Sequence, residues 1–197
     1  MRLWTIQPVE LYKKLQEQKI LLANPDLSEI LADDFDTDKR FKKAYQWIMD
    51  MMDEYGITCH GDARIPWWAW HTCEGKHKKP DLRKAVYDTK GKRCVCMELE
   101  IPDDQVLLTS HTFWHTILAD EPCWMFGNGE FDIDSFDTIY NIHQRVVSYL
   151  SEDQYKKYKH DSWKNIIDHA HDDKYIQATF WELRLSDVKK VWEFTAR

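Results

Sequence analysis

The stretch LWTIQPVELYKKLQEQKILLA, residues 3–23, decides the fold class because its hydrophobic period changes twice. Residues 3–7 alternate between two faces, as a β-strand does. Pro8 then suits the first turn of a helix, since its missing N–H would have no partner there. The helical period continues to about Gln18, and the apolar residues 20–23 predict a second short strand. The chain is therefore predicted to begin with a strand, a helix and a strand.

Strand and helix patterns continue to alternate downstream. Apolar residues from Phe41 to Met52 follow the helical period, and this helix is predicted to stop at Gly56. Aromatic, β-branched or alternating segments predict strands at residues 65–71, 86–87, 94–101, 175–183 and 188–194. Further helices are predicted at residues 113–118 and 136–150, after a cap at Ser151, and at 161–167. We therefore predict one α+β domain, residues 1–197, with small split antiparallel or mixed sheets flanked by helices.

Composition excludes several classes of protein. The formal charge of -7 argues against general nucleic-acid binding, which needs a basic face, although residues 76–84 are locally basic. No stretch approaches the roughly 20 apolar residues of a membrane helix. The N-terminus enters a strand pattern without an apolar signal region, and five irregularly spaced cysteines indicate free thiols. We expect a soluble protein of the reducing cytoplasm.

Aromatic residues are unusually frequent, with ten Trp, nine Tyr and eight Phe in the chain. Three of the tryptophans, Trp67, Trp68 and Trp70, fall within four residues. Tryptophan joins a large apolar face to one N–H donor, so an excess beyond core needs often lines ligand pockets or interfaces. Core filling is the simpler interpretation for most of them.

Two pairs of residues have the chemistry of metal ligands. Cys94 and Cys96 share one face of a predicted strand, and His111 and His115 would share one face of a helix. Neither spacing is that of a specific zinc motif. We favour buried free thiols and unrelated histidines, and predict that no metal is bound.

Catalysis by a nucleophile or by paired carboxylates is also weakly indicated. Cys59–His60 and the pair Cys73 with His71 combine a thiol with a base. Adjacent residues of an extended chain point in opposite directions, which disfavours the first pair. Glu98 and Glu100 share a strand face and would perturb each other's pKa if buried, but a solvated sheet face explains them better.

Motifs spread over nearly the whole chain resemble one bacterial and phage family, known chiefly as a domain of unknown function. They are Leu3–Pro8, Pro66–Trp70, Lys79–Arg83, Leu107–Leu108 with Trp114–His115, and Ile176–Trp181. Before the Trp-His segment the family usually carries Ser-Asp, where this chain has Thr109-Ser110. The family resemblance itself implies no chemistry.

The order of the predicted elements also resembles the ADP-ribosyltransferase-type fold, which binds NAD between two small sheets. Matched to that fold's first strand, Thr5 replaces its His and Gln7 replaces its Thr. In its late strand, Gln177 takes the place of the catalytic Glu. The resemblance implies that Thr5 and Gln177 are the catalytic positions. A Gln can bind a ribose hydroxyl but lacks the charge that stabilises an oxocarbenium-like transition state, which favours binding over catalysis.

Two hypotheses about function follow. In the first, Thr5, Gln7, Trp70, Arg83 and Gln177 converge on a cleft that binds a nucleotide such as NAD or ADP-ribose. Arg83 would hold the diphosphate and Trp70 the base. An enzyme with this cleft would be an ADP-ribosyltransferase or an NAD glycohydrolase. In the second, the chain is a non-catalytic, phage- or defence-linked module whose Trp-rich surface binds a protein partner. A concave polar cleft would favour the first, and an open flat Trp patch the second.

Overall fold

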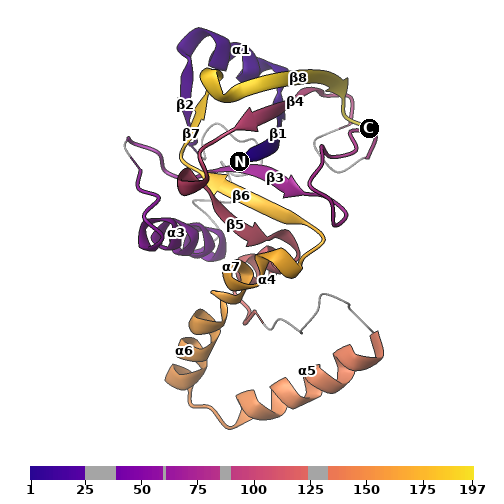
Figure 1. Cartoon of the computed structure of the whole chain (residues 1–197). Coiled ribbons are helices and arrows are strands. Elements are labelled where there is room, and N and C mark those ends of the chain that lie inside the picture. Colours follow the sequence, from indigo (N-terminus) through magenta and orange to yellow (C-terminus); the bar gives the residue numbers. More distant parts are fainter. Residues whose placement is uncertain (25–38, 60, 85–89, 124–132) are drawn as a thin grey trace.

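The computed structural model describes residues 1–24, 39–59, 61–84, 90–123 and 133–197, and in these ranges helices flank antiparallel sheets (Figure 1). The prediction of an α+β class is thereby confirmed. The strand predicted at residues 86–87 lies outside the described residues.

Within those ranges the large sheet has six strands, and every neighbouring pair is antiparallel. In spatial order they are β5 (Leu107–Ser110), β6 (Ile176–Phe180), β3 (Trp67–Thr72), β1 (Arg2–Pro8), β4 (Arg93–Glu100) and β8 (Val188–Thr195). The predicted first strand therefore lies inside the sheet, which explains why both faces of its first half are buried.

A small second sheet pairs β2 (Ile20–Leu22) with β7 (Glu182–Arg184), also antiparallel. The single strand predicted at residues 175–183 is therefore two strands, β6 and β7, in different sheets. The chain leaves the large sheet at Trp181, whose indole N–H donates to the carbonyl of Ile57 over 2.6 Å. This anchor separates the two strands.

The register of the large sheet decides which side chains share a face. One row of successive Cα partners crosses all six strands, namely Thr109, Gln177, Trp70, Trp4, Glu98 and Lys190. Paired residues project to the same side, and their chain neighbours to the other. We call the side of this row the Trp70 face. Thr5 and Gln7 alternate with Trp4 and project to the opposite side, which we call the Thr5 face.

The helices follow the predicted periods closely. They are α1 (Val9–Gln18), α3 (Lys39–Glu54), α4 (His111–Leu118), α5 (Ile133–Ser148), α6 (Glu152–Ser162) and α7 (Asn165–Asp168), with 3-10 turns η2 (Asp103–Gln105), η3 (Ala170–Asp172) and η4 (Leu185–Asp187). Gly56, just after α3, has a φ of 78°, a conformation that favours glycine. Ser151 caps α6 and forms a capping box with Gln154. The predicted helix at 161–167 is split between the end of α6 and α7.

Tryptophan fills much of the core. Six of the ten are buried, namely Trp4, Trp47, Trp67, Trp114, Trp163 and Trp181. Trp47 packs edge-on against Trp163 with ring centroids 5.7 Å apart, and Trp68 lies 4.9 Å from Trp114 of α4. The simpler interpretation, that most tryptophans are core residues, is therefore the correct one.

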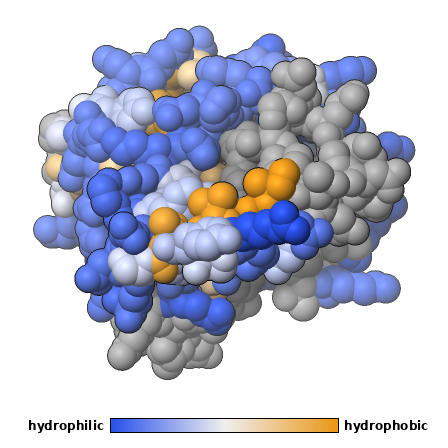
Figure 2. Space-filling view, turned by 90° about the horizontal axis from the view of Figure 1, so that it is seen from below, coloured by the Kyte–Doolittle hydropathy of each residue, from blue (hydrophilic) through white to orange (hydrophobic). Residues whose placement is uncertain are grey.

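Exposed apolar side chains gather on the arm formed by α5 and α6, which extends from the body (Figure 1). Tyr140, Ile142, Val146 and Tyr149 of this arm are exposed, and Figure 2, viewed from this side, shows apolar residues in a row across it. Among the described helices, none is both long and apolar enough to cross a bilayer.

Candidate functional site

The five predicted site residues lie in three separate places. Thr5 and Gln7 form one pair on the Thr5 face. The Gln7 amide N–H donates to the Thr5 hydroxyl over 2.9 Å, and that hydroxyl donates to the carbonyl of Trp68 over 3.0 Å. Thr5 is only 1% exposed. These contacts give the pair a structural role inside the sheet.

Gln177 and Trp70 lie together on the Trp70 face, as Cα partners on β6 and β3. Because β3 separates β1 from β6, the two strands matched to the NAD-binding fold are not neighbours. The register also places Trp4, rather than Thr5, in the row of Gln177. The structure therefore brings Gln177 and Trp70 together but separates them from Thr5 and Gln7 by the thickness of the sheet.

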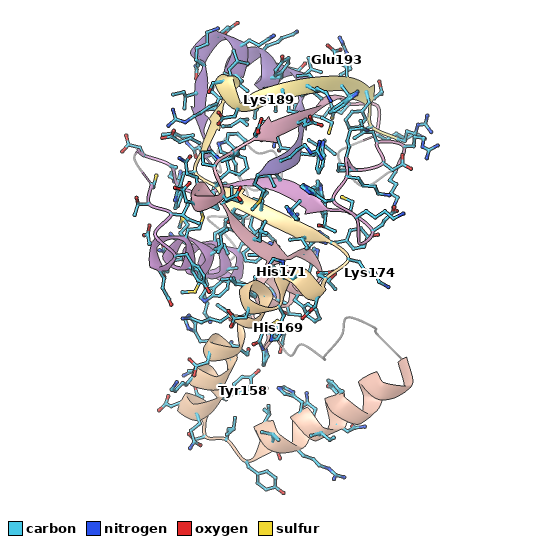
Figure 3. All side chains as sticks on the ribbon, viewed as in Figure 1. Tyr158, His169, His171, Lys174, Lys189 and Glu193 are labelled. Carbon is cyan, nitrogen blue, oxygen red and sulfur yellow. The ribbon has the colours of Figure 1, made fainter. Side chains whose placement is uncertain are left out.

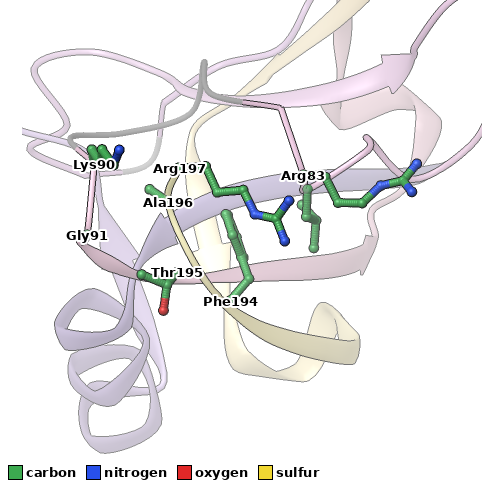
Figure 4. A pocket seen from close by; sticks show the side chains of 8 residues that line it. Arg83, Lys90, Gly91, Phe194, Thr195, Ala196 and Arg197 are labelled. Atoms are coloured by element: carbon green, nitrogen blue, oxygen red, sulfur yellow. The ribbon is translucent and has the colours of Figure 1, made fainter.

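Arg83 lies in the third place. Its guanidinium binds the Asp81 carboxylate through two hydrogen bonds of 2.8 and 2.7 Å. These bonds hold the pKa of Asp81 well below its usual range. Arg83 lines an open hollow beside Phe194 (Figure 4), and neither Gln177 nor Trp70 contributes to that hollow.

Around Gln177 the sheet carries two buried polar atoms without a hydrogen-bond partner in the described structure. They are Gln177 Oε1 and the hydroxyl of its Cα partner Thr109, which is fully buried. An unsatisfied buried polar atom costs about 1–3 kcal/mol. Native proteins retain few such atoms, and those often belong to functional sites.

Aromatic and imidazole rings surround this pair of atoms. The Trp70 ring lies 4.8 Å from the ring of His111, the first residue of α4, and 6.4 Å from Tyr175. His115, one turn further along α4, lies 5.0 Å from His111. Trp70, His111 and Tyr175 are each half-buried, so part of each ring reaches solvent.

Asp173 fixes the position of these rings. Its carboxylate accepts hydrogen bonds from the Ser110 hydroxyl, from the backbone and side chain of Thr112, and from the backbone N–H of Tyr175. Ser110 in turn caps α4 by accepting from the N–H of Phe113. The start of α4, which carries His111, is thus tied to the start of β6. Where the family pattern has an acidic residue, Ser110 receives its carboxylate from Asp173.

A second group of rings continues the same face. The register of β3 shifts between Trp70 and Thr72, so that His71 lies at a β-bulge. His71 stacks on His77 with ring centroids 4.2 Å apart, and His77 lies 5.3 Å from Trp4.

Burial lowers the pKa of His71 below its ordinary 6.5, and His77 and His171 lower it further. Burial, followed by His115, likewise lowers the pKa of His111. Both imidazoles are therefore neutral at pH 7, and each offers one donor and one acceptor.

The other candidate chemistries receive less from the structure. Cys94 and Cys96 are buried, and burial raises the pKa of Cys96 to about 12 and that of Cys73 to about 11. Glu98 is buried and accepts from the indole N–H of Trp4 over 3.3 Å, whereas Glu100 is exposed. In the part of the chain that is described, no three His, Cys, Asp or Glu side chains are grouped as metal ligands.

Sequence reasoning missed Thr109 and Tyr175 and considered His111 only as a metal ligand. Strand register would have linked Thr109 to Gln177, but β5 has only four residues and shows no countable alternation. The tryptophans Trp67, Trp68 and Trp70 form no open flat patch, since the first is buried and the other two are half-buried.

Comparison with known proteins gives one match. The model of a family described as "Domain of unknown function (DUF3841)" matches residues 2–189. No curated protein and no solved structure matches the chain.

Proposed function

We propose that this chain, which belongs to the DUF3841 family of domains of unknown function, binds a small nucleotide-type ligand on its Trp70 face. Such a ligand combines a flat ring, hydroxyl or amide groups and an anionic group. The binding residues would be Gln177, Thr109, Trp70, His111 and Tyr175.

The single observation that supports this most strongly is the pair of buried atoms without partners, Gln177 Oε1 and Thr109 Oγ1. They lie side by side on β6 and β5, so one ligand group could meet both. Gln177 Oε1 accepts hydrogen bonds, and the Thr109 hydroxyl both donates and accepts. A ribose hydroxyl has the matching chemistry. To reach these atoms, the ligand would displace the half-buried rings of Trp70 and His111.

The rings supply the second part of the proposal. Trp70, His111 and Tyr175 lie within 6.4 Å of one another in each pairing. Flat bases stack on aromatic side chains in a way that tolerates different bases. Neutral His111 also stacks without the cost of burying a charge.

Cationic side chains near Tyr175 suit the anionic part of the ligand. Lys174 immediately precedes Tyr175, and His171 lies one 3-10 turn earlier, in η3 (Figure 3). Lys84 reaches the same region, where it pairs with Glu74 over 2.5 Å. A phosphate would compete with Glu74 for Lys84 and bind Lys174 directly.

The proposal is limited to binding, with NAD as one candidate ligand. Gln177 carries no charge to stabilise an oxocarbenium-like transition state. Thr5, the other position matched to catalysis, lies on the opposite face. ADP-ribosyl transfer and NAD cleavage therefore receive no support from this geometry.

A thermal-shift and calorimetric comparison of AMP, ADP-ribose, NAD and adenosine tests the proposal. A ligand at 100 times its dissociation constant should stabilise the fold by about 2.7 kcal/mol. Gln177→Ala should weaken binding by roughly tenfold, because one ligand hydrogen bond is lost.

Gln7→Ala is the matched control, since Gln7 is also a half-buried strand glutamine but projects to the Thr5 face. It should leave the affinity unchanged. Absence of binding at millimolar concentration, or an equal loss in both variants, would overturn the proposal.

A further inference from the structure

A second hollow, separate from the Trp70 site, lies where the end of β8 meets the turn before β4. Its volume is about 640 Å³, and it is open to solvent (Figure 4). It is lined by Leu82, Arg83, Lys90, Gly91, Phe194, Thr195, Ala196 and Arg197. None of these residues belongs to the Trp70 site.

The charge of this hollow is opposite to that of the chain. Arg83, Lys90 and Arg197 line it and no carboxylate side chain does, whereas the chain as a whole carries -7. Asp81 already neutralises Arg83 through two hydrogen bonds. Within the described ranges, Lys90 and Arg197 form no ion pair. Two cations are thus available to an anion, and Arg83 becomes a third if its ion pair opens.

The wall between these cations is apolar and held in place. The Phe194 ring and Leu82 are half-buried in the hollow. Behind them, the N–H of Gly91 donates to the carbonyl of Ala196 over 2.8 Å, and the N–H of Ala196 donates to the carbonyl of Lys92 over 2.9 Å. These bonds continue the pairing of β4 with β8 beyond the strands, so the floor is an extension of the sheet.

We propose that this hollow binds a small ligand in which one carboxylate or phosphate group is attached to a ring or short apolar chain. The anionic group would lie between Lys90 and Arg197, where the planar guanidinium can give two parallel hydrogen bonds. The apolar part would pack on Phe194. The net charge of the chain works against long polyanions, because their further phosphates would meet an acidic surface.

The test uses the full chain and four probes: phenyl phosphate, benzoate, benzyl alcohol and inorganic phosphate. Binding is followed by calorimetry and by amide NMR shifts. Phenyl phosphate or benzoate should bind and shift the resonances of Gly91 and Ala196, and the tighter of the two identifies the anionic group. Benzyl alcohol should not bind, and inorganic phosphate should bind at least about tenfold more weakly than phenyl phosphate.

Lys90→Gln and Arg197→Gln should each weaken binding by about tenfold, and Phe194→Leu by less. All three positions are exposed or half-buried, so the fold should persist. Lys189→Gln is the control, because it removes the same charge from β8 outside the hollow. Failure of both aromatic anions to bind, or an equal effect of Lys189→Gln, would overturn the proposal. Gln177→Ala should not change this affinity, which separates the two sites.

Discussion

Asp173 and Ser110, 63 positions apart in the sequence, are joined by a hydrogen bond from the Ser110 hydroxyl to the Asp173 carboxylate. The same carboxylate accepts from the backbone N–H groups of Thr112 and Tyr175 over 3.0 and 2.9 Å. Three parts of the site thus depend on one side chain: the end of β5, the start of α4 and the start of β6.

Asp173→Asn should therefore destabilise the fold by about 1–3 kcal/mol, because the amide nitrogen cannot accept a hydrogen bond. The free energy of unfolding in urea measures this. Asp172→Asn is the matched control, since the Asp172 carboxylate is exposed and its contact is a single one to His169 at 3.2 Å. Equal losses in the two variants would contradict the role assigned to Asp173.

Thr109→Val and Thr179→Val should have opposite effects on stability. Both threonines are fully buried on neighbouring strands, but only the Thr179 hydroxyl has a hydrogen-bond partner, the carbonyl of Leu107 at 3.4 Å. Replacing the unpartnered Thr109 hydroxyl by a methyl group should stabilise the fold by about 1 kcal/mol, and the same change at Thr179 should destabilise it by a similar amount. Urea unfolding of both variants decides the matter. A loss of stability in Thr109→Val would mean that its hydroxyl is satisfied in solution.

Stability should fall as the pH is lowered below about 6.5. His71 and His111 have pKa values lowered by burial and by neighbouring histidines, so the unfolded chain binds these protons more readily. Their contribution is complete above pH 6.5 and is lost as the pH falls through the folded-state pKa values.

Melting temperatures at pH 7.5 and 5.5 should differ less in His71→Gln and His111→Asn than in the unmodified protein. The exposed His160 provides the control variant His160→Gln, which should keep the full difference. A pH dependence unchanged in all three variants would assign it to other groups.

Native protein should expose one reactive thiol. Cys59 is half-buried, whereas the other four cysteines are buried, and burial raises the pKa of Cys123 to about 12. Since the thiolate is the reactive form, Ellman's reagent should modify Cys59 quickly and all five cysteines only in urea. Cys59→Ser should remove the fast phase. Two or more fast thiols in the native protein would show that a buried cysteine becomes accessible.

Much of the fold could be predicted from the sequence because its signals are local. The alternation at residues 3–7, Pro8 at the helix start and Gly56 beyond α3 all act through the backbone of a few residues. The structure places β1, α1 and α3 where these signals indicate.

The site could not be predicted in the same way, because it depends on strand order and register. The alternation correctly placed Thr5 and Gln7 on one face, but only pairing with β3 shows that Trp4 shares the row of Gln177. Likewise, the continuous β-forming run at residues 175–183 gives no sign that Trp181 is anchored to Ile57, where the chain passes to another sheet.

The position of β6 between β5 and β3 has a consequence for the synthesis of the chain on the ribosome. While residues up to 175 are being made, β3 has a neighbour on one side only, and β5 has none in the sheet. The nascent chain therefore presents an open edge whose strand carries Trp67, Trp68 and Trp70. Translation of residues 176–180 closes that edge, so the sheet is completed in one late step rather than strand by strand, and the interval before it is when this protein is most exposed to aggregation.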